Sequence, residues 1–214
     1  MGCTLDPGGC VTAKVVPLQL CFKGERDYLQ GADIYQAVVD AIRGELREPV
    51  GGMRMAIRRF FGRQPDLLWM DSPEPSARPE SAVVDYTVDL PARRSGGWLV
   101  ESGRPVECRL PFDEARIALQ CAYSDRRVGV TGELGFLPIE VLVAMTKQLH
   151  QRNLPAPTGR WIFTRIELKR LLRRSDASAL SVTLEENLHN RLTRSSIVAG
   201  GEAIGSIYFS LTQP

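Results

Sequence analysis

The stretch LQLCFKGERDYLQG, residues 18–31, recurs in altered form as LQCAYSDRRVGVTG, residues 119–132. Setting each position n of the first stretch against n+101 in the second gives five similar pairs over fourteen positions. The pairs are Leu18 with Leu119, Gln19 with Gln120, Phe22 with Tyr123, Arg26 with Arg127, and Gly31 with Gly132. Similarity at a fixed spacing is typical of duplicated units. The sequence therefore predicts two copies of one folding unit.

A helix is predicted after each of these stretches. Residues 33–43 place apolar side chains at helical spacing, and Asp33 with Gln36 forms a capping pair at the start. Residues 137–151 show a similar stripe, with Pro138 in the first turn. His150 is expected at the helix end, where a cationic side chain complements the helix dipole. Both helices are predicted to bury one face.

Strand-like segments follow each helix in the same order. In residues 82–90, Val84, Tyr86 and Val88 fall on one side and polar residues on the other, which is typical of a half-buried strand. The predicted strands are residues 53–61, 82–90 and 98–110 in the first copy, and 161–168, 179–187 and 197–209 in the second. The expected order is therefore a strand, a helix and three strands, found twice.

The predicted domain organisation follows from this order. Residues 1–13 are expected to be a flexible tail, residues 14–112 the first copy and residues 113–214 the second. The Pro- and Ser-rich residues 70–81 are predicted to form a mobile loop inside the first copy.

Composition indicates an ordinary globular protein. The chain has 214 residues, of which 43% are hydrophobic, and a formal net charge of +2. This charge gives no strong field for nucleic acid or an anionic membrane, and no apolar run is long enough to span a bilayer. We expect a cytoplasmic protein with no nucleic-acid or membrane partner, and allow a homo-oligomer.

The five cysteines do not predict a metal site, because they include no CxxC pair and no histidine at ligand spacing. Cys21, Cys108 and Cys121 lie within apolar, strand-like runs, where cysteine usually packs as a small hydrophobic residue. Neither a metal nor a cofactor is predicted.

The order of strand, helix and three strands, with its only long helix after the first strand, resembles the hotdog fold of acyl-thioester thioesterases and dehydratases. The resemblance is architectural and covers nearly the whole chain. It implies an α+β tandem (double) hotdog, with two central helices each wrapped by an antiparallel sheet. It also implies a pair of clefts between the copies for an acyl-CoA or an acyl carrier protein substrate. There, the N–H groups at a helix N-terminus would face the thioester carbonyl.

The resemblance directs attention to residues 26–33 and 127–140, which precede or begin the two helices. Dehydratases of the family place a His before the helix and an Asp or Glu on it, whereas its thioesterases use an Asp or Glu as base or nucleophile. No His occupies either stretch. Gln30 or Asp33 stands near that place in the first copy, and Thr131 or Glu133 in the second. This speaks against a standard dehydratase and leaves a thioesterase-like carboxylate open.

Three carboxylates are candidate catalytic residues: Asp33, Glu133 and Glu140. Each also has a structural interpretation. Asp33 suits a helix N-cap, Glu133 suits a solvated loop, and Glu140 suits the first turn of a helix, where it would complement the dipole.

Five further residues are candidates for substrate binding. A tyrosine before the helix could contact a carbonyl or aromatic group, and glycines there permit close approach of a ligand to the backbone. The candidates are Tyr28, Gln30, Gly31, Gly132 and His189. Sheet packing, tight turning and an exposed hairpin are the alternative explanations for Tyr28, the glycines and His189.

The leading functional hypothesis is an acyl-thioester-processing protein, either thioesterase-like or dehydratase-like. The absence of the dehydratase His leaves a second hypothesis open, a non-catalytic binding or scaffold subunit. A nucleic-acid or regulatory-ligand binder is less favoured, because no nucleic-acid-binding motif supports it. Its phosphate-binding residues would be Arg58, Arg59, Arg170, Arg173 and Arg174.

Overall fold

A computed structural model describes residues 14–46, 48–70, 78–155 and 158–212. The predicted tail at residues 1–13 and most of the predicted loop at residues 70–81 lie outside these ranges. The elements are β1 (Lys14–Pro17), β2 (Phe22–Lys23), α1 (Gly31–Glu45), β3 (Met53–Ile57), β4 (Arg63–Met70), β5 (Ala82–Asp89), β6 (Arg94–Pro105), β7 (Arg109–Leu110), α2 (Glu114–Ala118), β8 (Cys121–Ser124), β9 (Arg127–Val130), α3 (Pro138–Asn153), β10 (Arg160–Leu168), the 3-10 helix η1 (Arg174–Ser178), β11 (Leu180–Leu188), β12 (Leu192–Ala199) and β13 (Glu202–Thr212).

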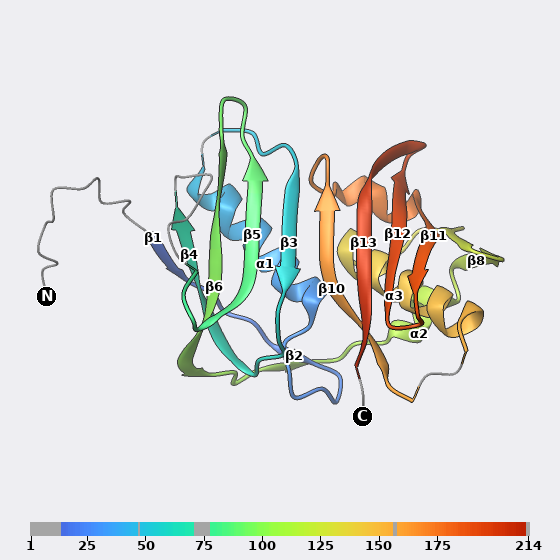
Figure 1. The fold of residues 1–214 in the computed structure, drawn as a ribbon, viewed down its shortest axis with the longest axis horizontal. Coiled ribbons are helices and arrows are strands. Elements are labelled where there is room, and N and C mark those ends of the chain that lie inside the picture. The colour runs from blue at the N-terminus through green and yellow to red at the C-terminus, as the bar shows by residue number, and fades with distance from the viewer. Residues whose placement is uncertain (1–13, 47, 71–77, 156–157, 213–214) are drawn as a thin grey trace, which may run out of the picture.

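Eleven strands form one antiparallel sheet in the order β1-β4-β6-β5-β3-β10-β13-β12-β11-β9-β8. From its outer edge to the junction, the first half runs β1-β4-β6-β5-β3, and the second runs β8-β9-β11-β12-β13-β10. Each half places the strand that follows its long helix at the junction, but the two inner strands are exchanged: β4 pairs with β6, whereas β11 pairs with β12. The halves meet where β3 pairs with β10, with Met55 opposite Ile166. Figure 1 shows this junction near the middle of the sheet. A separate parallel ladder joins the short strands β2 and β7.

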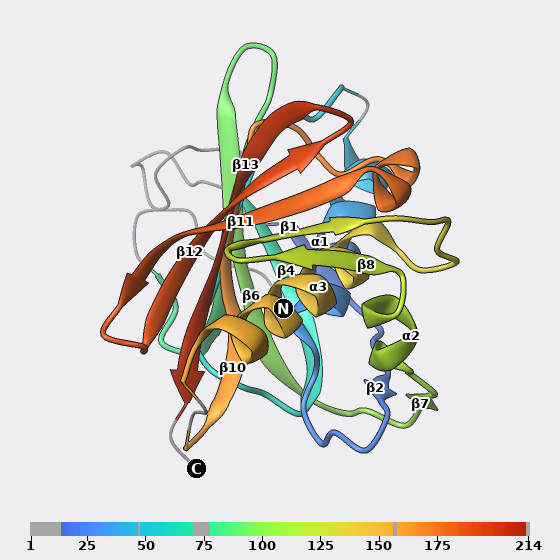
Figure 2. The same ribbon diagram turned by 90° about the vertical axis from the view of Figure 1, so that its right-hand side faces the viewer.

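Both long helices lie on the same side of the sheet (Figures 1 and 2). α1 lies behind the strands of the first half and α3 behind those of the second (Figure 1). α1 buries Ile34, Val38 and Ile42 at helical spacing, as its predicted apolar stripe requires. A single large apolar core fills the space between the helices and the sheet.

The two predicted helices are present, with different details at their ends. α1 begins at Gly31, two residues before the predicted start at Asp33, and its N-cap is Gln30. The expected capping role of Asp33 is therefore wrong, since its carboxylate contacts Lys23 instead. The prediction that His150 is a cationic residue at the helix end is also wrong, because His150 is 0% exposed and lies in the core of the protein.

Four strands of the large sheet, and not the predicted three, follow each long helix, and the short strand β7 comes after them in the first half. The prediction omitted β4 (Arg63–Met70) entirely. It also merged β12 and β13 into one strand over residues 197–209, although the chain turns at Gly200 and Gly201, both of which have positive φ. Left-handed backbone of this kind favours glycine and closes a hairpin.

The residue matches at a spacing of 101 do not describe equivalent positions. Gly31 is the first residue of α1, whereas Gly132 lies in the loop before α3, which begins at Pro138. What the two halves share is the succession along the chain of a strand, a long helix and four strands of the large sheet, and not that alignment.

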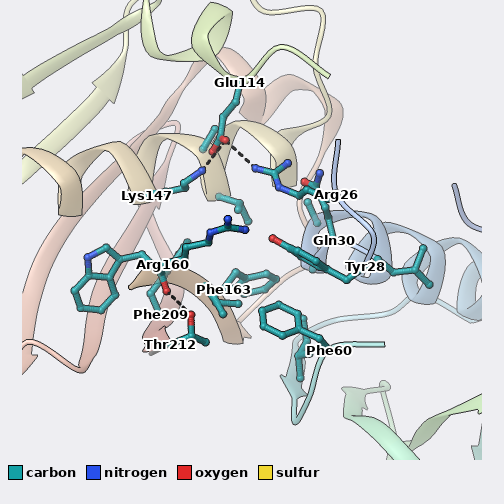
Figure 3. A pocket seen from close by; sticks show the side chains of 18 of the residues that line it. Arg26, Tyr28, Gln30, Phe60, Glu114, Lys147, Arg160, Phe163, Phe209 and Thr212 are labelled. Carbon is teal, nitrogen blue, oxygen red and sulfur yellow. Dashed lines mark hydrogen bonds and ion pairs between the residues drawn. The ribbon is translucent and has the colours of Figure 1, made fainter. Parts of the chain in front are cut away.

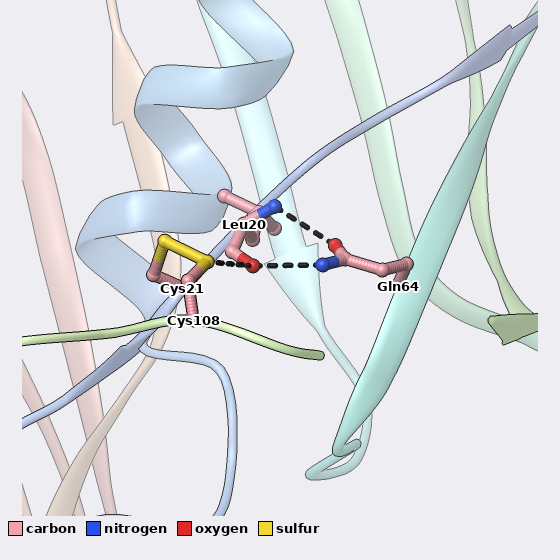
Figure 4. The surroundings of a disulfide bond; sticks show 4 residues. All are labelled: Leu20, Cys21, Gln64 and Cys108. Atoms are coloured by element: carbon pink, nitrogen blue, oxygen red, sulfur yellow. Dashed lines mark hydrogen bonds between the residues drawn. A yellow bond between two sulfur atoms is a disulfide. The ribbon is translucent and has the colours of Figure 1, made fainter. Parts of the chain in front are cut away.

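A disulfide joins Cys21 to Cys108 and corrects the expectation that both are packed thiols. Figure 4 shows it beside the side-chain amide of Gln64, which bonds both the N–H and the carbonyl of Leu20. The bond fastens the segment entering β2 to the segment entering β7. Disulfides persist mainly in oxidising compartments, so a cytoplasmic location stays a prediction. No helix in the described part of the chain is long and apolar enough to cross a membrane.

Candidate functional site

A cavity of about 1160 Å³ lies where the two halves of the chain meet. The first half contributes the segment before α1 and the first residues of that helix, including Gly31 and Ala32. The second half contributes one face of α3 and parts of β10 and β13, including Phe163 and Phe209. Both halves are therefore needed to form its wall (Figure 3).

An ion cluster connects the first turns of α1 and α3 at one side of this cavity. The Lys23 ammonium, from β2, lies 2.5 Å from Oδ1 of Asp33 and also contacts Oε1 of Glu140. The other oxygen of Glu140 accepts the backbone N–H of Leu137 at 2.8 Å, which caps α3. Glu140 lines the cavity and is 8% exposed. It is therefore not a surface residue whose only role is to complement the helix dipole.

Burial shapes the ionisation of this cluster. Loss of solvent raises the pKa of Asp33 above its ordinary value, although the Lys23 ammonium opposes the shift. The pKa of Lys23 is also raised, because hydrogen bonds to Asp33 and Glu140 outweigh the lowering effect of burial. Oδ2 of Asp33 is buried and has no hydrogen-bond partner within the described residues. Two carboxylates thus face one ammonium, an arrangement suited to holding a proton.

A second ion cluster crosses the cavity wall between the halves. The carboxylate of Glu114, at the start of α2, accepts hydrogen bonds from Arg26 at 3.2 Å and from Lys147 of α3 at 2.8 Å (Figure 3). With two cations to one carboxylate, this side of the cavity carries excess positive charge.

The N-terminus of α1 opens on the cavity. Helical bonding begins with the Ile34 N–H, which donates to the Gln30 carbonyl, so the preceding N–H groups have no acceptor within the helix. The Gln30 side chain makes no capping bond. A Cβ added to Gly31 would overlap the side chains of Phe163 and Ile57, so glycine keeps this part of the cavity open.

Aromatic rings form another part of the cavity wall. Tyr28 packs against Phe60 with ring centroids 4.5 Å apart, and Phe163 packs against Phe209 at 6.1 Å. These four rings line a space that suits an apolar ligand segment.

His150 lies behind this wall. Its ring is 4.9 Å from that of Trp161 and 5.1 Å from that of Phe209, between centroids. Nε2 lies 3.1 Å from the Thr193 hydroxyl, and burial lowers the His150 pKa to about 4. This histidine is therefore neutral at pH 7.

The structure brings some of the sequence-predicted site residues together. Tyr28, Gln30, Gly31 and Glu140 line the cavity, and Asp33 joins them through Lys23. The other three candidates lie outside the lining: Glu133, Gly132 and His189. Glu133 is exposed, and His189 is exposed in the turn between β11 and β12. Their functional roles stay predictions.

Sequence reasoning missed several residues of the site: Lys23, Glu114, Lys147 and Arg160. Lys147 follows Glu140 by seven positions, a spacing that puts both on one face of α3, and this was the available signal. Lys23, Glu114 and Arg160 carry no such local pattern.

Neither a protein-family model nor a curated protein matches this sequence. Solved structures of similar shape include a GphF dehydratase variant, at a TM-score of 0.49 and 9% identity, covering 98% of this chain and 96% of that one. A putative thioesterase II from Thermobifida fusca YX has a TM-score of 0.46 and 10% identity, covering 93% and 91%. The pyran synthase domain from module nine of the sorangicin pathway has a TM-score of 0.46 and 12% identity, covering 94% and 91%. These likenesses are too distant to carry an argument about activity.

The strand order and the placement of the long helices define the class of this protein. Each long helix lies against its half of the antiparallel sheet, with β1 before α1, β8 and β9 before α3, and four strands of the sheet after each helix. The chain has a hotdog-type fold.

Proposed function

We propose that this chain is an acyl-thioester-processing protein built as a tandem hotdog, with copies at residues 14–112 and 113–214. The observation that carries the proposal is the shared cavity beside the N-terminus of α1. A second support is that four strands of the large sheet follow both α1 and α3, with the first of them, β3 or β10, at the junction of the halves. The substrate would be an acyl-CoA or an acyl group on a carrier protein.

The thioester carbonyl is assigned to the open end of α1. There, the N–H groups of Gly31 and Ala32 would donate to the carbonyl oxygen and stabilise the negative charge that develops on it. The absence of a side chain at Gly31 allows this approach. The acyl chain would then lie along the aromatic wall that includes Phe163 and Phe209.

Glu140 is the proposed proton-transfer residue, since it lines the cavity from the helix opposite α1. In hydrolysis it would accept a proton from water as the water oxygen bonds to the carbonyl carbon. The C–S bond then breaks, and the same proton passes to the leaving sulfur. Lys23 would hold Glu140 in place, and Asp33 would tune the charge of the cluster.

A non-catalytic binding subunit is the second candidate function. It is favoured by the ion pairs at the site: Asp33 and Glu140 both contact Lys23, while Glu114 contacts Arg26 and Lys147. The carboxylate oxygens in these ion pairs already contact a cation, which would leave them less available to a water molecule. The same cavity would then bind the thioester without turning it over.

The two functions separate in a panel of acyl-coenzyme A and acyl-carrier thioesters of varied chain length, scored by thermal shift and by release of free thiol. Processing predicts turnover of one class, with a loss of at least about 100-fold in Glu140→Gln. Glu80→Gln, at an exposed position outside the cavity lining, is the control and should match the wild type. Stabilisation without turnover would establish the binding subunit, and no response to any thioester would refute both.

The remaining carboxylate candidates are tested in the same panel. Asp33→Asn should lower turnover less than Glu140→Gln does, because Asp33 acts through Lys23. Glu133→Gln tests the candidate that lies outside the cavity lining. A loss of turnover confined to Glu133→Gln would move the site to the loop before α3 and contradict the assignment of Glu140.

A further inference from the structure

Arg160 and Tyr28 place two unpaired hydrogen-bond donors in the cavity. Arg160 is the first residue of β10, in the second half of the chain, and Tyr28 precedes α1 in the first half. Figure 3 shows the guanidinium and the phenol hydroxyl pointing toward one another within the cavity. Among the residues that the structure describes, neither side-chain polar group has a hydrogen-bond or ion-pair partner.

The other cations of the cavity lining are already paired. Arg26 and Lys147 both contact Glu114, and Arg59 contacts Glu101. Arg160 is thus the one lining cation without a carboxylate in the described ranges, 14–46, 48–70, 78–155 and 158–212. An unpaired guanidinium facing a cavity is suited to a ligand anion, and its planar fork matches the two oxygens of a carboxylate.

Gln30 adds a third donor close by in the chain. Its Nε2 is buried without a hydrogen-bond partner in the described structure. A buried donor that lacks an acceptor is costly, so an acceptor supplied by a ligand would be favourable. The ring of Tyr28 is held by its contact with Phe60, which orients the hydroxyl before a ligand arrives.

We propose that the acyl group carries a carboxylate at its far end, held by Arg160, Tyr28 and Gln30. This inference rests on the proposed function, which places the thioester carbonyl at Gly31. Tyr28 and Gln30 lie only a few residues before Gly31, so the anion binds close to the carbonyl. The phosphates of a carrier are separated from the thioester by the long pantetheine arm. An anion close to the carbonyl therefore belongs to the acyl group, which identifies a short dicarboxylic acyl thioester.

The test compares pantetheine amides, in which nitrogen replaces the thioester sulfur to prevent hydrolysis. The amides are made in pairs of equal acyl chain length, one ending in a carboxylate and the other in the uncharged methyl ester. Affinity is measured by titration calorimetry. For at least one length, the wild type should bind the carboxylate about 10-fold or more tightly than the ester. Arg160→Gln should remove that preference, and Tyr28→Phe should reduce it.

Arg54→Gln is the matched control, because Arg54 is an exposed strand arginine on β3 outside the cavity lining. It removes the same formal charge and should retain the preference. Thermal unfolding of each variant verifies that the fold is intact. Equal affinity for carboxylate and ester, or a preference that survives in Arg160→Gln, would overturn the inference while leaving the proposed function in place.

A second comparison separates the acyl carboxylate from a carrier phosphate. The same neutral acyl group is presented on pantetheine and on coenzyme A. If Arg160→Gln weakens only the coenzyme A form, Arg160 binds phosphate and the inference is wrong. If the wild type binds no acyl compound of either series, the proposed function fails and this inference fails with it.

Discussion

The Lys23 ammonium lies 2.5 Å from the Asp33 carboxylate, inside a cluster that also includes Glu140. Asp33 belongs to α1 and Glu140 to α3, so a single lysine from β2 connects the helices of the two halves. The side chains of Lys23, Asp33 and Glu140 are only 11%, 13% and 10% exposed. Electrostatics within this cluster therefore contribute to the stability of the junction as well as to the chemistry of the cavity.

Replacing Lys23 by Met should destabilise the protein by roughly 3–5 kcal/mol at pH 7, because it leaves two buried carboxylates without their counter-ion. Urea unfolding measures the change. Lys14→Met is the control: the Lys14–Glu45 pair is more exposed and should contribute no more than about 1 kcal/mol. Adding Asp33→Asn to Lys23→Met should recover part of the loss. Equal costs for the two single lysine variants would contradict the structural role of the cluster.

Because His150 is buried, we predict that the fold loses stability in acid. The His150 pKa is lowered to about 4 by burial, against an ordinary value near 6.5, so the unfolded chain binds the proton more tightly. The contribution of this group to stability is complete above pH 6.5 and is lost as pH falls toward 4. The free energy of unfolding should drop by roughly 3 kcal/mol over this interval from His150 alone.

The measurement is urea unfolding at a series of pH values between 7 and 4. His150→Gln removes the titrating group and should flatten the slope, whatever its absolute stability. His189→Gln, at an exposed turn, should leave the slope unchanged. An unaltered slope in His150→Gln would show that this histidine does not titrate as its burial requires.

The Cys21–Cys108 disulfide should stabilise the fold, because it joins residues 87 positions apart in sequence. Closing a long loop restricts the unfolded chain, and loss of such a bond typically costs about 2–4 kcal/mol. The double change of Cys21 and Cys108 to Ser should lower the melting temperature, and dithiothreitol should bring the wild type to a similar value. Cys121→Ser, at the free cysteine of the described residues, should have a much smaller effect. A wild type insensitive to reductant would argue against this bond in solution.

Substitution of Gly31 tests whether a ligand binds against the start of α1. Gly31→Ala would push a methyl group against Phe163 and Ile57 and should weaken acyl-thioester binding by about 10-fold or more. Gly44→Ala is the control on the same helix, where a Cβ meets nothing within 4 Å. That change should leave binding unaltered and stabilise the helix by up to about 1 kcal/mol. Titration of a non-hydrolysable ligand measures both variants, and equal affinities would remove Gly31 from the binding surface.

Periodicity predicted the helices well because the apolar stripes of α1 and α3 are local features of the chain. β4 was missed because its segment, RQPDLLWM, includes Pro65 and lacks clean alternation, while its neighbours β1 and β6 supply the pairing that makes it a strand. The turn at Gly200 and Gly201 did carry a hairpin signal. The apolar run over residues 197–209 nevertheless resembles one long strand.

The cavity was harder to predict, because its contacts join distant residues. Lys23 and Glu140 are separated by 117 positions, and Cys21 and Cys108 by 87. No local pattern specifies such pairs, and the connectivity of cysteines does not follow from their spacing. Tyr28, Gln30 and Gly31 were found because they precede a recognisable helix. Arg160 was not, since it stands at the first position of an ordinary strand.

The most direct test of the central claim is a crystal structure with a non-hydrolysable acyl-pantetheine amide. We predict that the ligand lies in the cavity between the two halves, with its amide carbonyl within hydrogen-bond distance of the Gly31 or Ala32 N–H and its acyl chain against Phe163. A ligand bound elsewhere, or bound in the cavity with its carbonyl remote from the start of α1, would contradict the proposed function.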